Sequence, residues 1–351
     1  MVLLTGAAGF VGGQVATALS EAGHEVVGVD GLIPQAHPID AEPPAGVRRL
    51  DLRDATGLDA LLAGVDLVCH QAAMVGNGVD VADFPEYASH NDLGTAALLA
   101  AMARAGVDRL VLASSMVVYG DGRYRCPDHG VVAPAPRRMP DLDAGVFDHR
   151  CHRCEALLEW VSVDESAPLR PRTAYAASKV AQEHYAAAWC TLRSARAVAL
   201  RYHNVYGPGL PADTPYAGVA AIFRSAAAHG EPPRLYEDGR QTRDFVHVSD
   251  VAAANVAAVE AVAGHPDGLT AYNVCSGQPR TVGDLAAAIA SASGGPEPVV
   301  TGAYRPADVR HVVASPDAAR SGLGFQAQID PDVGLKELAT APLRPTTDHW
   351  R

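Results

Sequence analysis

Two side chains capable of acid–base chemistry stand four positions apart in Tyr175-Ala-Ala-Ser-Lys179. They lie within Ala174 to Trp189, a run rich in Ala, Gln and Glu, and these residue types favour a helix. Residues four apart share one helical face, so the Lys179 ammonium could stabilise a Tyr175 phenolate. A chance Tyr and Lys on an amphipathic helix is the alternative, because this spacing is common. Tyr175 is therefore a candidate acid and base that needs support from the rest of the chain.

A glycine-rich turn opens the chain between a predicted strand and a predicted helix. The apolar run Val2 to Thr5 leads into Gly6-Ala-Ala-Gly9-Phe-Val-Gly12, and a helical pattern then extends to about Ala22. Glycines permit a tight turn and a close backbone approach, and the helix N-terminus offers N–H groups to a pyrophosphate. This order predicts a dinucleotide site whose backbone contacts are Gly6, Gly9, Phe10, Val11 and Gly12.

An acidic residue ends the second predicted strand, Glu25 to Asp30. Asp30 stands at about the distance from the turn where a carboxylate accepts the hydroxyls of the adenosine ribose. No arginine follows it directly, so the sequence favours NAD over NADP. A turn or helix-capping aspartate is the alternative. After the next candidate strand, Asp51 and Leu52 are expected to flank the adenine.

A fourth predicted strand, Leu67 to His70, leads into a stretch that can lie against the dinucleotide. An Ala-rich helix from about Asn91 to Arg104 follows. Together with the later Tyr202, the predicted cofactor contacts in this part of the chain are Gln71, Ala72, Ala73 and Asn91.

The next predicted strand, Arg109 to Ala113, ends in two hydroxyl residues, Ser114 and Ser115. Such residues are often only turn formers, but beside a Tyr/Lys pair one of them can orient a substrate hydroxyl or carbonyl. Strands that alternate with helices predict a parallel sheet with ligands at its carboxyl edge. We therefore predict an α/β fold with a Rossmann-type doubly wound sheet, in which residues 1–204 bind NAD and residues 205–351 form a smaller, partly interleaved substrate domain.

Composition limits the classes of function. The 351 residues are 48% hydrophobic and 19% charged, which is enough for a sizeable core. A formal net charge of −12 argues against nucleic acid as a partner, so an anionic ligand must be held by a few local arginines. No apolar run approaches a bilayer span and no charged leader precedes the first strand, so we expect a soluble, cytoplasmic protein without a membrane partner.

An insert between residues 123 and 158 carries the pairs Cys126-Pro-Asp-His129 and Cys151-His-Arg-Cys154. Two such pairs separated by a loop match a structural zinc site, and Gly130 suits the tight turn of a zinc knuckle. Free thiols are the alternative, and His149 and His152 compete with His129 as the ligand. A catalytic metal is not expected, because four protein ligands leave no open position. The predicted zinc ligands are Cys126, His129, Cys151 and Cys154.

The chain resembles the extended short-chain dehydrogenases/reductases of the NAD-dependent epimerase/dehydratase family over nearly its whole length. The resemblance rests on the glycine-rich turn and on four later motifs in the family's order: Ser-Ser before Val118-Tyr119-Gly120, Tyr175 with Lys179, Arg201-Tyr-His-Asn204-Val-Tyr-Gly-Pro208, and Gly239-Arg-Gln-Thr-Arg243-Asp-Phe-Val-His-Val248. The insert, with a later Arg-Pro-Ala-Asp-Val-Arg-His run, is similar to a subset of bacterial nucleotide-sugar 4-epimerases that act on deoxyhexoses.

The resemblance implies a role for each motif. Ser115 becomes the catalytic hydroxyl, with Ser114 nearer the nicotinamide, and a nucleoside-diphosphate sugar becomes the substrate. Arg243 is implied on the diphosphate, and Arg305 fits a second phosphate clamp because a guanidinium grips phosphate oxygens in a fixed geometry. A surface ion pair is the alternative for each arginine, and more so for Arg310 than for Arg243. The predicted substrate contacts are Ser115, Asn204, Tyr236, Arg243, Arg305 and Asp308.

The residues after the catalytic hydroxyl bear on the reaction. The family's sugar 4,6-dehydratases carry an acid and a base there, whereas this chain has Met116 and Val117, which disfavours loss of water. The remaining machinery suits 4-epimerisation of a dTDP- or UDP-sugar through a transient 4-keto sugar. Lys179 and the cationic nicotinamide are expected to lower the pKa of Tyr175 from ~10 towards neutrality. The alternatives are a reductase, dehydratase or decarboxylase of similar sugars, or a non-catalytic NAD sensor.

Two further expectations concern assembly and the chain end. The helices from Asn91 and Ala174 resemble the pair through which relatives form dimers, so a homodimer is expected. The stretch Ala341 to Arg351 lacks periodicity and is predicted to be a tail.

Overall fold

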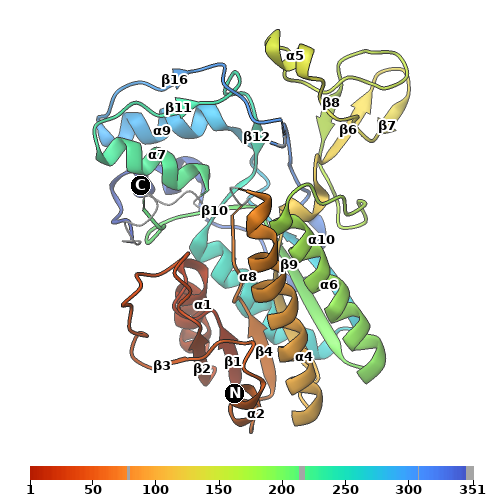
Figure 1. The fold of residues 1–351 in the computed structure, drawn as a ribbon, viewed down its shortest axis with the longest axis vertical. Coiled ribbons are helices and arrows are strands. Elements are labelled where there is room, and N and C mark those ends of the chain that lie inside the picture. The colour runs from red at the N-terminus through yellow and green to blue at the C-terminus, as the bar shows by residue number, and fades with distance from the viewer. Residues whose placement is uncertain (77–79, 213–217, 307, 345–351) are drawn as a thin grey trace.

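The computed structural model describes residues 1–76, 80–212, 218–306 and 308–344, and its centre is one parallel sheet (Figure 1). The strand order is β14-β9-β5-β4-β1-β2-β3. The order reverses between β1 and β4, and ligands bind beside such a switch point at the carboxyl ends of the strands. In chain order the strands are β1 (Val2–Thr5), β2 (Val26–Asp30), β3 (Val47–Arg49), β4 (Leu67–His70), β5 (Arg109–Ser115), β9 (Arg196–Tyr202) and β14 (Gly268–Val274).

Helices cover both faces of this sheet, which confirms the doubly wound α/β prediction. One apolar cluster joins Leu4 and Val111 of the sheet to one layer of helices, and a second joins Leu3 and Leu110 to the other layer. Every residue of β1 and β4 is buried, as expected for strands covered on both sides. The first layer contains α1 (Phe10–Glu21), α8 (Val248–Ala261) and α10 (Asp317–Leu323), and the second contains α2 (Ala55–Leu61), α4 (Gly94–Ala105) and α6 (Ala174–Arg193).

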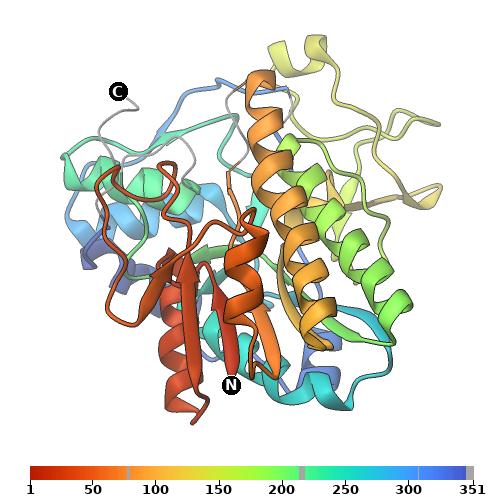
Figure 2. The same cartoon turned by 60° about the horizontal axis from the view of Figure 1, so that its bottom comes forward.

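The helix predicted from Asn91 begins earlier than the sequence pattern suggested. Its first turns are η1 (Val81–Asp83), α3 (Phe84–Tyr87) and the π-helical η2 (Ala88–Leu93), which continues directly into α4. A wide π-helical turn re-aims side chains, and here it contains the buried Asn91. Figures 1 and 2 both show α4 and α6 side by side on one face of the sheet.

A smaller body lies beyond the carboxyl edge of the sheet. Its apolar cluster is built around residues such as Tyr206, Phe245 and Leu285. Since α8 and β14 return to the main sheet, the two bodies are interleaved along the chain. The smaller body contains β10 (Asn204–Tyr206), α7 (Val219–Ala228), β11 (Arg234–Leu235), β12 (Thr242–Arg243), β13 (Phe245–His247), β15 (Arg280–Thr281), α9 (Val282–Ser293), β16 (Val299–Val300) and α11 (Pro331–Thr340).

The insert forms a separate arm after the short helix η3 (Met116–Tyr119). A three-stranded sheet of order β7-β6-β8 holds it, and its apolar cluster is small, including Tyr124 and Leu158. Figure 1 shows the arm projecting above α6. Its elements are β6 (Arg123–Cys126), β7 (Gly130–Val132), α5 (Met139–Asp143) and β8 (Glu159–Val161).

The prediction of a tail from Ala341 is wrong for its first four residues. Arg344 forms a bridge with Pro211, so the chain folds back onto the smaller body. Residues 345–351 lie outside the described residues. Within the described part, η4 (Val262–Gly264) completes the helices, and none of the helices there is both long and apolar enough to cross a membrane.

Candidate functional site

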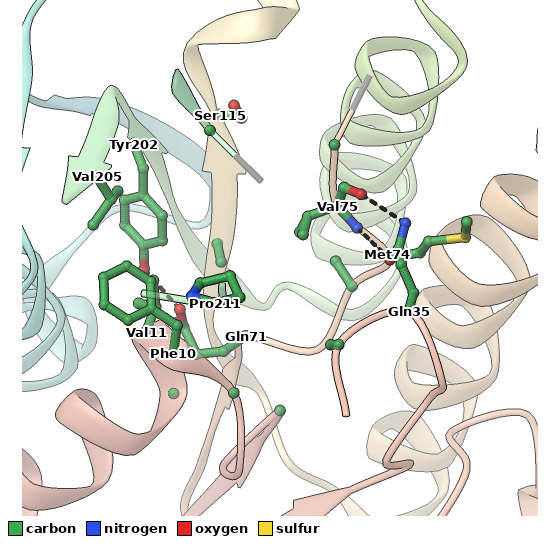
Figure 3. Close-up of a pocket in the computed structure, with 18 of the residues that line it drawn as sticks. Phe10, Val11, Gln35, Gln71, Met74, Val75, Ser115, Tyr202, Val205 and Pro211 are labelled. Atoms are coloured by element: carbon green, nitrogen blue, oxygen red, sulfur yellow. Dashed lines mark hydrogen bonds between the residues drawn. The ribbon is translucent and has the colours of Figure 1, made fainter. Parts of the chain in front are cut away.

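A cavity of about 830 Å³ opens at the carboxyl edge of the sheet and reaches the smaller body (Figure 3). Its wall includes most of the residues predicted from the sequence. The predicted residues that line it are Gly6, Gly9, Phe10, Val11, Gly12, Asp30, Asp51, Leu52, Gln71, Ala72, Ala73, Ser114, Ser115, Tyr175, Lys179, Tyr202, Asn204 and Arg305.

The glycine-rich turn is tight, and side chains at two of its glycines would clash with neighbouring backbone. A Cβ on Gly12 would lie 1.9 Å from the carbonyl oxygen of Gly6, and one on Gly6 would lie 2.7 Å from the amide nitrogen of Ala72. Helix α1 starts at Phe10, and no side chain caps it at Gly9 among the described residues. Its first N–H groups are therefore available to an anion, which fits the pyrophosphate of a dinucleotide.

Asp30 ends β2 on the wall of the cavity. Its Oδ2 accepts a hydrogen bond from the amide of Ala8 at 3.0 Å, and its Oδ1 accepts one from Leu32 at 2.8 Å. Each carboxylate oxygen can accept a second bond, so both remain suited to ribose hydroxyls. Farther along the wall, Arg53 pairs with Asp51 at 2.6 Å, and this hydrogen-bonded pair lowers the pKa of the Asp51 carboxyl.

Helix α6 presents Tyr175 and Lys179 to the cavity after an N-cap in which Thr173 accepts a hydrogen bond from Ala176. The Lys179 ammonium donates to the Ala113 carbonyl at 2.8 Å and lies 5.9 Å from the centre of the Tyr175 ring. Burial lowers the pKa of Lys179 to about 7, although the Glu183 carboxylate opposes this shift.

The sequence led us to expect a lowered pKa for Tyr175, and this prediction is wrong for the protein without its cofactor. Burial raises the pKa of the phenol to about 12, and only a hydrogen bond with Ser115 acts in the other direction. The physical reason is that Lys179 is held by a backbone carbonyl while the phenol itself is removed from water. The effect expected from the nicotinamide stays a prediction.

A buried acidic residue behind the site was missed from the sequence. Glu183 accepts a hydrogen bond from the Ser114 hydroxyl at 2.5 Å and pairs with Arg201 at 2.8 Å. Arg201 in turn donates to the Tyr119 hydroxyl at 2.9 Å. The only signal in the sequence is the position of Glu183, one helical turn after Lys179.

Asn91, which was predicted to contact the cofactor, is placed away from the cavity in this structure. Asn91 is fully buried and does not line the cavity. Its side-chain oxygen accepts a hydrogen bond from the Met74 N–H at 2.7 Å. Its side-chain nitrogen donates to the Met74 carbonyl at 2.9 Å and to the Ser178 hydroxyl. Asn91 therefore holds the loop after β4 in place.

Two polar contacts lie at separate places on the cavity wall (Figure 3). The Tyr202 hydroxyl donates to Gln71 at 2.9 Å, which fixes two of the predicted cofactor residues against each other. The Gln35 side chain bonds the carbonyl and the N–H of Val75, at 2.8 and 3.2 Å, and joins the loops after β2 and β4. Nothing in the sequence pattern indicated Gln35.

The arginines predicted to bind the substrate divide into two groups. Arg305 lines the cavity and lies over the Tyr236 ring, 5.1 Å from its centre. Arg243 does not line it, because its guanidinium donates to the carbonyls of Thr242, Val309 and Arg310. The expected contact of Arg243 with a diphosphate is thus not supported by this arrangement.

Tyr236, Asp308 and Arg310 also lie away from the cavity wall. Tyr236 is 38% exposed and reaches the cavity only through Arg305. Burial raises the pKa of Asp308 despite the nearby Arg305 and Arg243. Arg310 does form the ion pairs given as its alternative, with Glu237, Asp238 and Asp148, but its own side chain is buried and not on the surface.

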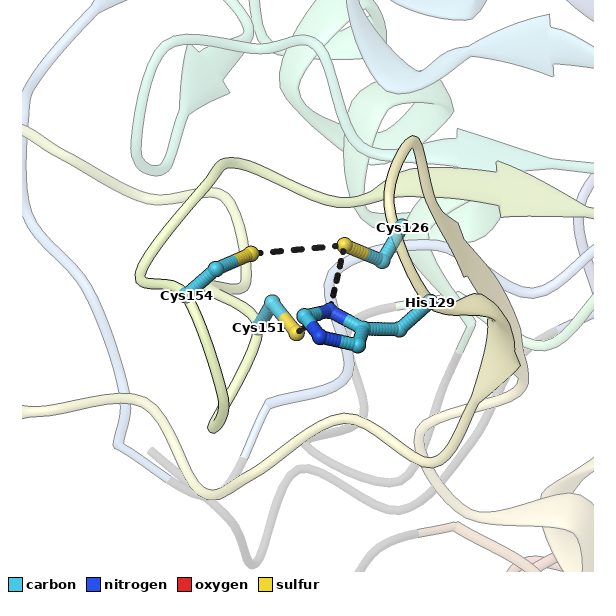
Figure 4. Close-up of side chains that lie close together, drawn as sticks. All are labelled: Cys126, His129, Cys151 and Cys154. Atoms are coloured by element: carbon cyan, nitrogen blue, oxygen red, sulfur yellow. Dashed lines mark hydrogen bonds between the residues drawn. The ribbon is translucent and has the colours of Figure 1, made fainter.

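The Cys and His residues of the insert converge on one point (Figure 4). The donor atoms of Cys126, His129, Cys151 and Cys154 all lie within 4.8 Å of one another. The Cys126 sulfur is 3.4 Å from His129 Nδ1 and 3.5 Å from the Cys154 sulfur. A tetrahedron with zinc–sulfur bonds of ~2.3 Å has edges of about 3.8 Å, so the donor set fits zinc.

His149 is not part of this cluster. Its Nδ1 faces the carbonyl of Ala135 at 2.9 Å, and its ring packs edge-on against Tyr124. Gly130, directly after His129, has a φ of +66°, as expected for the turn of a knuckle.

The parallel sheet, the glycine-rich turn and the Ser115, Tyr175 and Lys179 group define a short-chain dehydrogenase/reductase of the extended type. The model of the "NAD dependent epimerase/dehydratase family" matches residues 2–139 and 159–275. The chain belongs to this family. The match leaves out residues 140–158, where Cys151 and Cys154 of the insert lie.

Three relatives illustrate the similarity. The dTDP-L-rhamnose 4-epimerase of Burkholderia thailandensis is 34% identical over 348 residues, covering 97% of this chain and 94% of that protein. The UDP-glucose 4-epimerase of Streptomyces lividans is 31% identical, covering 92% of this chain and 90% of that protein. The crystal structure of the Thermus thermophilus UDP-glucose 4-epimerase in complex with NAD is 30% identical, has a TM-score of 0.75, and covers 96% of this chain and 97% of that one.

Proposed function

We propose that the protein catalyses the NAD-dependent epimerisation of a nucleoside-diphosphate sugar at C4 through a transient 4-keto sugar. The observation that carries this proposal is the placement of Ser115, Tyr175 and Lys179 on one cavity wall with Met116 and Val117. The last two side chains can neither donate nor accept a proton, so they favour inversion over loss of water. The named relatives act as 4-epimerases, which agrees with this assignment.

Each catalytic side chain has a separate task at the C4 hydroxyl. When bound, NAD supplies the acceptor that takes hydrogen from C4 and returns it. Tyr175 as phenolate accepts the hydroxyl proton and later gives it back, and the Ser115 hydroxyl beside it orients the same oxygen. Lys179, held at Ala113, places a cation next to the phenol. Net reaction needs no second substrate.

The sugar is proposed to be a deoxyhexose linked to dTDP, with UDP-hexoses as the second choice. The relative with dTDP-L-rhamnose in its name supports the first, and the UDP-glucose 4-epimerases support the second. Arg305 is proposed to hold the diphosphate and Asn204 a sugar hydroxyl, because both line the cavity. NMR of the purified protein with dTDP-L-rhamnose, UDP-glucose and UDP-galactose tests the proposal. Inversion at C4 supports it, whereas net NADH formation or release of carbon dioxide identifies a different reaction.

The Cys/His cluster is proposed to hold a structural zinc ion. The arm has few apolar residues in its core, so a metal would stabilise it where packing cannot. The arm also supports the segment that carries Arg305. Arg137 donates to the Asp308 carbonyl at 2.6 Å, and Asp143 accepts a hydrogen bond from Tyr304. The zinc ion would thus position a substrate-binding arginine without taking part in the chemistry.

A homodimer formed through η2, α4 and α6 is the proposed assembly. Three large apolar side chains on these elements face solvent in the single chain. Leu93, Tyr185 and Leu192 are 55%, 46% and 83% exposed. Light scattering tests the assembly, and Leu192→Glu should shift a dimer towards monomer.

A further inference from the structure

The C-terminal segment crosses from the smaller body to the mouth of the cavity. The amide of Arg344 donates to the Leu210 carbonyl at 2.8 Å, and the Arg344 carbonyl accepts from Ala212 at 2.9 Å. The Pro342 carbonyl accepts from Gly209 at 3.2 Å. Leu210 also lines the cavity, so this segment is fixed to a loop of the cavity wall.

The side chain of Arg344 reaches across to the Rossmann body. Nη1 donates to the carbonyl of Ala8 at 2.8 Å, and Nη2 donates to that of Ala36 at 3.2 Å. Ala8 belongs to the glycine-rich turn, and Ala36 lies in the loop after β2. One guanidinium therefore joins both bodies at the predicted dinucleotide end of the cavity.

Burial lowers the pKa of Arg344, and the nearby Asp30 carboxylate opposes this shift without forming an ion pair with the guanidinium. Among the described residues, no carboxylate lies within ion-pair distance of its guanidinium, and its buried Nε has no hydrogen-bond partner. Each oxygen of the nearby Asp30 accepts one hydrogen bond, from the amide of Ala8 or of Leu32, and can accept a second. The side chain is half-buried, and its two bonds to carbonyls use two of the five guanidinium N–H donors, so the arrangement can accept an anionic ligand at the cavity.

The other cations of the cavity have different positions. In the described part of the chain, the Lys and Arg side chains on its wall are Lys179, Arg305 and Arg344. Lys179 stands beside the phenol, and Arg305 stands on Tyr236 at the substrate side. Of these three cations, only Arg344 contacts the glycine-rich turn, where the first amides of α1 are predicted to bind a pyrophosphate.

We propose that Arg344 binds a phosphate of the dinucleotide and thereby fastens the C-terminal segment over the bound cofactor. A guanidinium offers donors in a planar fork that suits phosphate oxygens. Fastening the segment would retain the cofactor through both halves of an epimerisation cycle. The inference rests on the proposed function only in taking NAD as the ligand.

The test compares ligands with and without phosphate by calorimetry on protein freed of nucleotide. Arg344→Gln should weaken NAD and ADP about 10- to 100-fold, as expected for loss of a charge-assisted bond, and should change adenosine affinity by no more than about twofold. Arg224→Gln is the matched control, because Arg224 donates to the carbonyls of Leu338 and Ala341 and does not line the cavity. NAD affinity should stay within about twofold in that variant.

Several results would overturn the inference. They are unchanged NAD affinity in Arg344→Gln, equal losses for NAD and adenosine, or an equal loss of NAD affinity in Arg224→Gln. If Arg344→Gln does not fold, Arg344→Lys keeps the charge and should still weaken NAD more than adenosine. If wild type inverted no sugar, that result would count against the proposed function. The NAD, ADP and adenosine affinities could still be measured and would test this inference separately.

Discussion

Lys179 lies one helical turn after Tyr175, yet its ammonium bonds the Ala113 carbonyl and stays 5.9 Å from the centre of the phenol ring. Burial acts on both groups, raising the pKa of Tyr175 to about 12 and lowering that of Lys179 to about 7. The protein alone therefore resists ionising either side chain. Activation of the phenol must come with the bound cofactor and substrate.

Lys179 makes stability depend on pH. Its folded pKa of about 7 lies below the ordinary value of 10.5, so the unfolded chain binds more protons between these values. Stability should consequently rise as pH increases through this window, and the penalty is fully present below pH ~7. Lys179→Met should stabilise the NAD-free protein most near about pH 6, and the gain should shrink by about pH 9.5.

Thermal melts of wild type and Lys179→Met across this range check the sign. The exposed Lys336 provides the control, because Lys336→Met removes an ammonium that the fold does not bury. A gain for Lys179→Met that is the same at both ends of the range would contradict the assignment.

Neutralising Glu183 is expected to lower the free energy of unfolding of the protein. Its side chain and that of Arg201 are 3% and 5% exposed, and Glu183→Gln would leave the buried guanidinium without its partner. Removing one partner of such a pair costs about 3–5 kcal/mol. The exposed pair of Asp59 and Arg104 is the comparison, and Asp59→Asn should cost no more than about 1 kcal/mol. Urea unfolding measures both, and equal losses would refute the burial argument.

Arg305 should act on the substrate and not on the cofactor. Arg305→Gln is expected to raise KM for the nucleotide sugar about 10- to 100-fold through loss of a charged hydrogen bond, with NAD affinity unchanged. Arg240→Gln is the control, because Arg240 is exposed and absent from the cavity wall. A KM that is unchanged in Arg305→Gln would remove this residue from the substrate site.

Zinc should matter for substrate binding through the position of the arm. Purified wild type is expected to contain one zinc ion per chain by elemental analysis, and Cys154→Ser should reduce this content and lower the thermal stability. Cys190→Ser is the control for zinc content, since Cys190 lies on α6 in an apolar cluster and outside the Cys/His cluster. Full zinc content in Cys154→Ser, or none in wild type, would contradict the site.

The sequence predicted the parts of the site that depend on local order. The strand, glycine-rich turn and helix around Gly6 to Gly12 fold as expected, as do the strand before Ser114 and the helix that carries Tyr175. Each of these elements is specified by neighbouring residues, so a pattern of apolar and small side chains is sufficient. The four residues predicted as zinc ligands also lie close together, as their spacing indicated.

Local sequence patterns did not predict the contacts between distant segments. Arg243 donates hydrogen bonds to backbone carbonyls more than 60 positions away. Asn91 points inward because it lies in the π-helical turn that precedes α4. Arg344 bonds a carbonyl 336 positions away, in a stretch that looked like a tail. Composition and periodicity carry no information on these pairings, because tertiary packing decides which donor meets which acceptor.

The most direct test of the account is Tyr175→Phe, which removes one oxygen from the proposed acid and base. NMR with the sugar nucleotide that wild type inverts, together with calorimetry for NAD, would measure both functions of the site. We expect NAD affinity to be retained and C4 inversion to fall by about 10²- to 10⁴-fold, the usual contribution of a positioned proton-transfer group. Inversion at the wild-type rate in Tyr175→Phe would show that another group moves the proton and would contradict the proposed chemistry.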